Sequence, residues 1–130
     1  MDQSTTGIKY IYVQSGGSYS NNIIDNNKLR ELVESYCDVV KRPSIVRHYG
    51  LIDTWETLHV TDMSNLFYGK NNFNESLESW DTTNVTNMSA MFYKANSFNQ
   101  NIGEWDTKKV TDMSHMFHGA STFNNNSNYI

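Results

Sequence analysis

Two histidines, His115 and His118, have the spacing of a possible metal site. Side chains three residues apart lie on one face of a helix, where two imidazoles can bind an ion such as zinc. An earlier copy of the surrounding sequence holds Ala90 and Tyr93 at these positions, so the pair occurs once, and no third ligand accompanies it. We therefore predict a solvent-exposed surface here and no metal site.

Three carboxylates, Glu56, Asp81 and Asp106, recur at equal spacing along the chain. In a stack of repeats they would form a column with a spacing of about 4.8 Å, which could attract a cation. Each, however, precedes a threonine in a turn-like segment and can accept hydrogen bonds from nearby backbone N–H groups. We favour this structural role.

No arrangement typical of an enzyme stands out. Serine, histidine and acidic residues are abundant, but none lies in a nucleophile-elbow context, and no glycine-rich phosphate loop occurs. Cys37 is the only cysteine, which excludes an internal disulfide, and we expect its thiol to be inert. The sequence therefore predicts a non-catalytic protein without a cofactor or metal.

Charge and hydropathy restrict the classes of molecule that the protein is expected to bind and where it is expected to be located. A net charge of −4 over 130 residues argues against nucleic-acid binding, which needs a basic surface. No stretch approaches the roughly 20 apolar residues that span a bilayer, and no secretory signal is visible. We expect an intracellular or virion-associated location.

The strongest pattern is an internal repeat with a period of about 25 residues and no gaps. A unit this short cannot bury its own apolar face and must stack on its copies. The apolar positions that recur are Trp55, Trp80, Trp105, Val60, Val85, Val110, Met63, Met88, Met113, Phe67, Phe92, Phe117, Phe73, Phe98 and Phe123. A polar position recurs as Asn74, Asn99 and Asn124, for which we predict an asparagine ladder along a corner of the stack.

Each repeat is expected to fold as a short strand followed by a short helix. In the third copy, alternation over residues 102–110 is typical of a strand. Met113, Met116 and Phe117 then follow the spacing of one helix face, with Thr111 as the N-cap. Three such coils give an α/β repeat solenoid.

The repeat residues closely resemble the BspA-like leucine-rich-repeat family, which includes bacterial surface proteins, Mycoplasma proteins, and proteins of protists and large DNA viruses. The third copy reads Trp105-Asp-Thr-Lys-Lys-Val110-Thr-Asp-Met113-Ser-His-Met-Phe117. The resemblance covers about residues 50–124 and, with a helical segment before Tyr49-Gly50, extends to about residue 28. It implies a leucine-rich-repeat fold and a protein-binding or structural role.

The chain is expected to divide into an N-terminal strand or arm (1–24), a helical cap (25–54), the three-coil solenoid (55–124) and a C-terminal tail (125–130). An apolar stripe predicts a helix over 25–42 that ends at Pro43 and covers the first coil. A separate partner-binding helix is the alternative. Residues 8–13 have strand composition and either add to the cap or pair with a neighbouring chain. The last coil has no evident cap, so a partner or self-association there is plausible.

Recognition should use positions that differ between the copies. Tyr68, Tyr93 and His118 are expected to form an exposed column of rings suited to a protein interface. The other candidates are Leu58, Thr83 and Lys108, on the strand face. The expected function is protein binding or scaffolding, with a virion component or host-interaction protein of a large DNA virus as the setting that the resemblance implies. The alternative is a fragment of a cell-surface adhesin that binds host matrix proteins.

Overall fold

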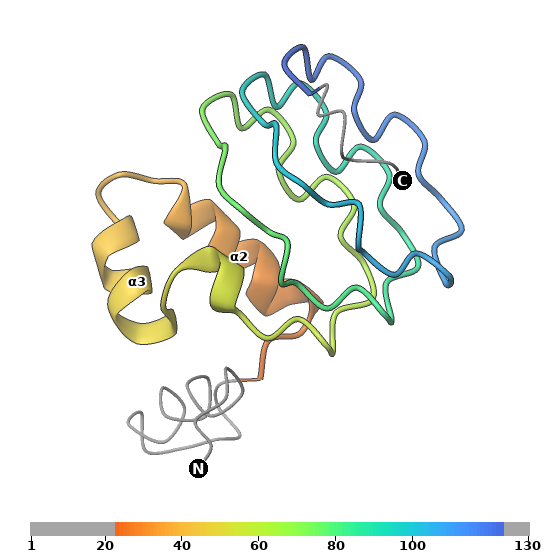
Figure 1. The fold of residues 1–130 in the computed structure, drawn as a ribbon. Coiled ribbons are helices and arrows are strands. Elements are labelled where there is room, and N and C mark those ends of the chain that lie inside the picture. The colour runs from red at the N-terminus through yellow and green to blue at the C-terminus, as the bar shows by residue number, and fades with distance from the viewer. Residues whose placement is uncertain (1–22, 124–130) are drawn as a thin grey trace.

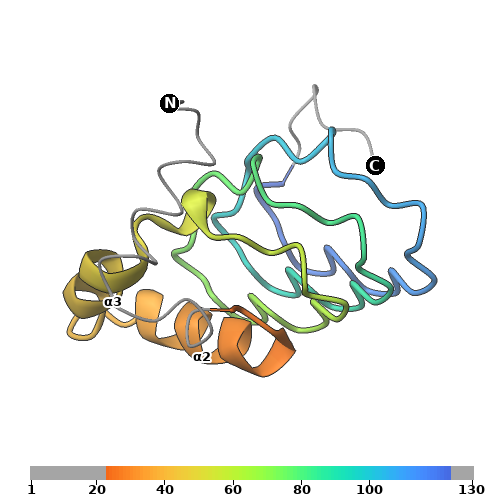
Figure 2. The same ribbon diagram turned by 90° about the horizontal axis from the view of Figure 1, so that it is seen from below.

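The computed structural model describes residues 23–123, shown in Figure 1. Within this range two α-helices come first, α2 (Asn26–Tyr36) and α3 (Arg42–Tyr49), followed by a 3-10 turn at Ile52–Thr54. The remaining described chain contains almost no strand, only isolated bridges that join Asp62 to Asn87 and Asn87 to Asp112. It winds back on itself, so that successive windings, here the first (55–79), second (80–104) and third (105–123), lie side by side (Figures 1 and 2). The predicted arm (1–24) and tail (125–130) lie almost wholly outside the described residues.

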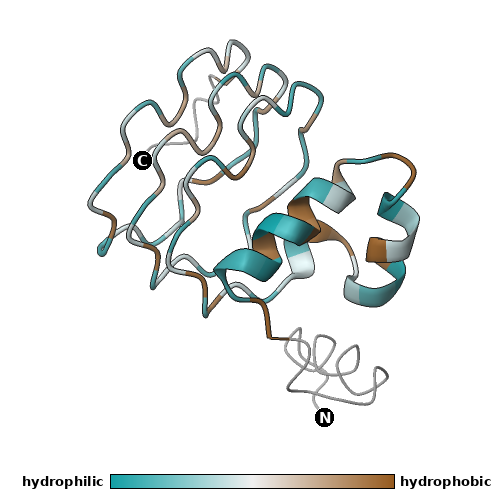
Figure 3. Cartoon of the chain, turned by 180° about the vertical axis from the view of Figure 1, so that it is seen from behind, coloured by the Kyte–Doolittle hydropathy of each residue, from teal (hydrophilic) through white to brown (hydrophobic). Residues whose placement is uncertain are grey.

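Helix α2 forms for the reasons seen in the sequence, but it ends earlier than predicted. Asp25 caps it by accepting the Lys28 N–H at 2.8 Å. Its buried face consists of Leu29, Leu32, Val33 and Tyr36. Figure 3 shows apolar and polar residues alternating along the helix, as this one-sided burial requires.

The single helix predicted over 25–42 is therefore wrong. The Asp38 carboxylate accepts the N–H groups of Val40 (2.8 Å) and Lys41 (3.3 Å), which turns the chain after α2. Val39 and Val40, expected in the apolar stripe, are 86% and 83% exposed. Pro43 does not stop a helix; it lies in the first turn of α3, where its missing N–H costs nothing.

The strand and helix expected in each repeat are also absent, because the described windings consist of consecutive tight turns. Asn65, Ala90 and His115 have φ values of 59°, 53° and 59°, which a right-handed helix cannot contain. Turns close between residues three apart, as from the Leu66 N–H to the Met63 carbonyl at 3.3 Å. In the first two windings, alternate N–H groups that a helix would use internally donate to the next winding instead.

The core is a large cluster of buried aromatic and aliphatic side chains. Rings at equivalent positions of successive windings stack: Phe67 on Phe92 at 5.4 Å between centroids, and Phe92 on Phe117 at 5.6 Å. A second file joins Phe73 to Phe98 (6.0 Å) and Phe98 to Phe123 (5.9 Å). The chain from 23 to 123 is thus a small domain of two helices, almost no strand and one aromatic core.

Burial weakens toward the last winding. Met63 and Met88 are fully buried, whereas Met113, expected in the core, is 36% exposed. The positions 110, 117 and 123 are only partly buried, unlike their counterparts in the two earlier windings. The physical reason is that no described residue packs on the outer side of this winding.

Helix α2 covers the first winding, at the opposite end of the stack, and one of its side chains accepts a hydrogen bond that a backbone carbonyl accepts in the later windings. Thr86 N–H donates to the Thr61 carbonyl and Thr111 N–H to the Thr86 carbonyl, both at 2.8 Å. At the first winding the Thr61 N–H donates instead to Asn26 Oδ1 of α2, at 2.9 Å. Arg30 adds an ion pair with Asp62 at 3.3 Å. The Asn26 amide thus replaces a preceding winding.

Candidate functional site

Three rings predicted to form a column lie in one stack on the surface. The Tyr68 and Tyr93 rings are 4.6 Å apart between centroids and nearly parallel, at 6°. The Tyr93 ring stacks on His118 at 4.9 Å, with 22° between the planes. Tyr68 is 51% exposed and His118 is exposed, whereas Tyr93, predicted to be exposed, is half-buried between them. Because successive windings have equal length, one ring per winding gives a continuous aromatic surface.

A lysine and a second imidazole border this aromatic column, by which we mean Tyr68, Tyr93 and His118. The Lys94 ammonium lies 5.7 Å from the centroid of the Tyr93 ring. His115 meets His118 edge-on, with centroids 6.0 Å apart. Exposed rings bury much area with little loss of side-chain entropy, so such a surface can serve as the centre of a protein interface.

The second predicted set, Leu58, Thr83 and Lys108, occupies one corner of successive windings. Each residue follows the first position of a turn, such as the turn from the Thr57 carbonyl to the Val60 N–H at 3.0 Å. Leu58 is 36% exposed, and the other two are also exposed. The structure links this corner through Asn84, whose amide donates to the Leu58 carbonyl at 2.9 Å.

Two of the three recurring carboxylates, Asp81 and Asp106, have the structural role that the sequence favoured. Asp81 accepts the Thr83 N–H at 3.0 Å, and Asp106 accepts the Lys108 N–H at 3.0 Å. Asp112, in another corner, accepts the Ser114 N–H at 2.9 Å and its hydroxyl at 2.7 Å. The bond from the Ser114 backbone N–H is the main cause that lowers the pKa of the Asp112 carboxyl.

The histidine pair does not lie on a helix, because His115 has a positive φ of 59°. Among residues 23–123, no three His, Cys, Asp or Glu side chains gather in a way that could hold a metal ion. The same part of the chain contains no helix long and apolar enough to cross a membrane.

The asparagine position forms one rung of the expected ladder in the described range. Asn74 Oδ1 accepts the Asn99 N–H at 2.8 Å and the Gln100 amide at 3.0 Å. Asn124, the third member, lies outside the described residues. The rung joins two windings at a corner where backbone groups would otherwise face solvent.

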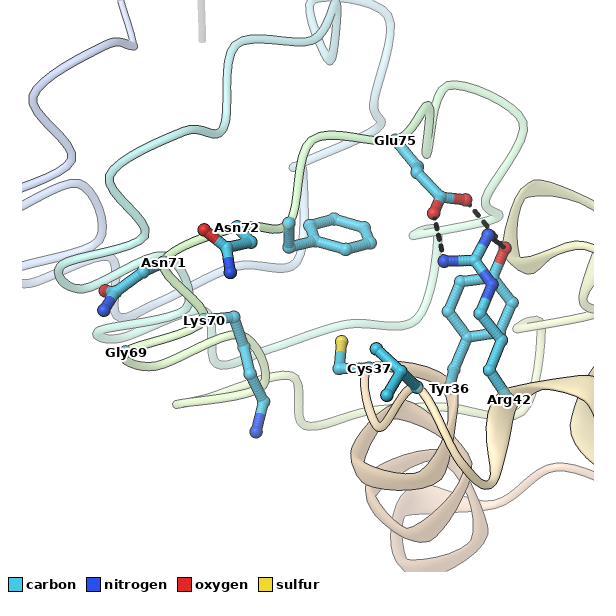
Figure 4. Close-up of a pocket in the computed structure, with 10 residues that line it drawn as sticks. Tyr36, Cys37, Arg42, Gly69, Lys70, Asn71, Asn72 and Glu75 are labelled. Carbon is cyan, nitrogen blue, oxygen red and sulfur yellow. Dashed lines mark hydrogen bonds and ion pairs between the residues drawn. The ribbon is translucent and has the colours of Figure 1, made fainter.

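Sequence reasoning missed a cavity of about 430 Å³ between the end of α2 and the first winding (Figure 4). The Tyr36 hydroxyl donates to Glu75 at 2.7 Å, and Arg42 forms an ion pair with the same carboxylate at 2.7 Å. The Arg42 guanidinium also lies 4.2 Å from the centroid of the Tyr36 ring. Only the apolar spacing of Tyr36 was visible in the sequence, since its partner is 39 residues away.

Burial and the Glu75 hydrogen bond raise the pKa of the Tyr36 phenol from 10.0 to about 12. Burial likewise raises the pKa of the Cys37 thiol, which lines the same cavity. A raised thiol pKa disfavours the nucleophilic thiolate. The cavity is therefore built around a neutral phenol and a neutral thiol, with its charges paired.

The Tyr36 pKa predicts an alkaline loss of stability. Above pH 10 the unfolded chain releases this proton first, so it binds fewer protons than the folded chain and the free energy of unfolding falls as pH rises toward 12. Urea titrations between pH 8 and 12 should show a steeper decline for the native chain than for Tyr36→Phe. Parallel declines for the two chains would contradict the coupling.

One comparison with known proteins succeeds. A family model described as "Mycoplasma protein of unknown function, DUF285" matches residues 41–129, well over half of the chain. No curated protein and no solved structure matches the chain. The matched range contains all the described windings, including the aromatic column, together with α3. The chain therefore belongs to the DUF285 family of Mycoplasma proteins of unknown function.

Proposed function

We propose that this chain is a non-catalytic protein-binding or scaffold module, built as a three-coil repeat solenoid of the BspA-like leucine-rich-repeat type. The regular spacing of contacts supports the solenoid. The indole N–H of Trp80 donates to the Ile52 carbonyl (2.7 Å) and that of Trp105 to the Leu77 carbonyl (3.0 Å), both 28 residues earlier. Such contacts between neighbouring copies are how repeat proteins obtain their stability.

The observation that carries the binding role is the aromatic column. Its rings stack on one another, so their orientation is fixed before a partner arrives. Fixed aromatic side chains lose little further entropy on binding, which favours affinity. We expect the partner to present a flat apolar surface, because such a surface packs on ring faces, whereas the Lys94 ammonium beside Tyr93 would repel a cationic one.

The corner formed by Leu58, Thr83 and Lys108 is the lesser candidate, because its residues share no ring or apolar surface. The non-catalytic assignment rests on the absence of an enzyme-like motif in the sequence. The viral or host-interaction setting and the alternative of a surface adhesin stay predictions that rest on the family resemblance.

The column can be tested by placing a photo-crosslinking amino acid at position 68 and, as a control, at the exposed position 72. We expect a partner that crosslinks from position 68 and not from position 72. With that partner purified, the variant Tyr68→Ser/Tyr93→Ser should bind about tenfold or more weakly, because two interface rings are lost.

The control variant is Thr83→Ser, which changes the other surface by one methyl group and should bind normally. Equal affinity of the native chain and the double variant, at unchanged thermal stability, would overturn the role of the column. Crosslinking with the same yield from both positions would have the same meaning.

A further inference from the structure

Four backbone N–H groups of each winding point in one direction, toward the next winding. In the first winding they donate to carbonyl groups at distances from 2.7 to 2.9 Å: Met63 to Asn87, Asn65 to Ser89, Phe67 to Met91 and Gly69 to Tyr93. In the second the distances are also 2.7 to 2.9 Å: Met88 to Asp112, Ala90 to Ser114, Phe92 to Met116 and Lys94 to His118. At these four positions every connection has the same polarity, whereas just before them the Thr86 N–H donates back to the Thr61 carbonyl at 2.8 Å.

The third winding repeats this geometry without a described acceptor. His115 and Gly119 have φ values of 59° and 74°, close to those of Asn65 and Gly69, at 59° and 71°. The N–H groups of Met113, His115, Phe117 and Gly119, here called the donor row, therefore point outward in the same way. Within residues 23–123 they meet no hydrogen-bond acceptor.

The outer side of the third winding also lacks hydrogen bonds that the two earlier windings make with their successors. The Ile52 and Leu77 carbonyls accept a tryptophan indole 28 residues later, but Ile102 accepts only the Trp105 backbone N–H among the described residues. Thr57 and Thr82 donate their hydroxyls to Asp81 (2.9 Å) and Asp106 (3.0 Å). The Met113 side chain, in the third winding, is 36% exposed.

The polarity of the donor row decides what can cover it. Two copies of this chain related by a two-fold axis would bring N–H groups against N–H groups, which cannot pair. An ordinary β-strand presents N–H and C=O groups alternately along one edge, so half of its groups would be mismatched. The row needs a partner that presents carbonyls alone at every second residue.

We propose that the donor row is a docking edge for a coil of this same repeat type, supplied by another polypeptide whose first coil carries no cap. Such a coil presents carbonyls at every second residue, as Asn87 and Ser89 do. Its tryptophan would donate to the Ile102 carbonyl, and its apolar residues would cover Met113. A second copy of this chain cannot supply the coil, because α2 occupies that side through Asn26 and Thr61.

This inference rests on the proposed solenoid, and one experiment separates the two. Amide hydrogen exchange of the full-length chain is followed by NMR, residue by residue. The rows that begin at Met63 and Met88 should be protected, whereas the donor row should exchange about a hundredfold faster. Fast exchange in all three rows would sink the solenoid itself.

The docking is then tested with a synthetic peptide that copies residues 76–100, one full repeat. At millimolar concentration it should slow exchange of the four donor-row amides at least about tenfold. The same peptide with alanine in place of its tryptophan should protect them much less. Met113→Glu in the protein should abolish the protection, whereas Val40→Glu, at an 83% exposed position after α2, should preserve it.

Three results would overturn the docking edge while leaving the solenoid intact. The first is protection of the donor row in the free monomer, which would mean that another part of the chain covers it. The second is that the peptide leaves the row unprotected, or perturbs only the aromatic column. The third is that the chain dimerises, as seen by sedimentation, and protects the row without any peptide.

Discussion

Replacing Trp80 with alanine is expected to lower the free energy of unfolding by about 3–5 kcal/mol, the range for a buried aromatic residue truncated in a core. Trp80 is 3% exposed and lies between two windings. Its ring stacks on Trp55 at 6.5 Å and lies 6.0 Å from Phe67. The substitution removes these contacts together with the indole hydrogen bond to Ile52, so it opens a cavity and leaves the Ile52 carbonyl with the weaker Trp55 N–H bond alone.

Urea unfolding followed by circular dichroism and by tryptophan fluorescence gives the free energy. Trp80→Phe serves as the control, because it keeps most of the ring volume and should cost distinctly less than alanine. Trp105→Ala should also cost less than Trp80→Ala, since Trp105 is packed from one side and is 7% exposed. Equal stability of Trp80→Ala and the native chain would contradict the stacked core.

The sequence predicted the period and the stacking because both depend on residue type at a fixed spacing. The file of Phe67, Phe92 and Phe117 needs only one ring in each repeat and windings of equal length. The surface column followed from the same logic. A repeated sequence supplies its own internal comparison, so positions that pack against their copies are visible without a structure.

The local conformation of each winding could not be predicted in the same way. The spacing of Met113, Met116 and Phe117 is that of a helix face, but it also fits consecutive turns that bury the same side chains. The difference lies in the positive φ of Asn65, Ala90 and His115. Asparagine tolerates that region, but alanine gives no hint of it. At Asn65 and Ala90, hydrogen bonds to the next winding offset the strain, and those bonds are not local in sequence.

The cap was predicted as an element but not in its details. The apolar stripe located α2, which Asp25 caps. The break after Tyr36 depends on the Asp38 side chain, which accepts the backbone N–H groups two and three residues later and so competes with helical hydrogen bonds. The cavity beside Tyr36 needs Arg42 and Glu75 to meet although they are far apart in the sequence, which no local pattern reveals.

Buried threonines should provide the second large effect. The Thr57 hydroxyl donates to the Asp81 carbonyl at 2.9 Å and accepts the Asp81 N–H at 2.8 Å, and the side chain is fully buried. Thr57→Val keeps the volume but leaves both backbone groups of Asp81 without this partner. We expect a loss of about 1–3 kcal/mol, the cost of unsatisfied buried polar groups.

The repeat offers a matched control for this change. Thr107 is the third copy of the same position. Among the described residues, its hydroxyl donates no hydrogen bond to a later winding. Thr107→Val should therefore change the free energy of unfolding by only a few tenths of a kcal/mol, the usual effect away from buried polar contacts. The difference between the two variants, measured in urea, isolates the hydrogen bonds that join one winding to the next. If both variants lose the same stability, the threonine contributes through its own turn, and the bonds between windings matter less than the geometry indicates.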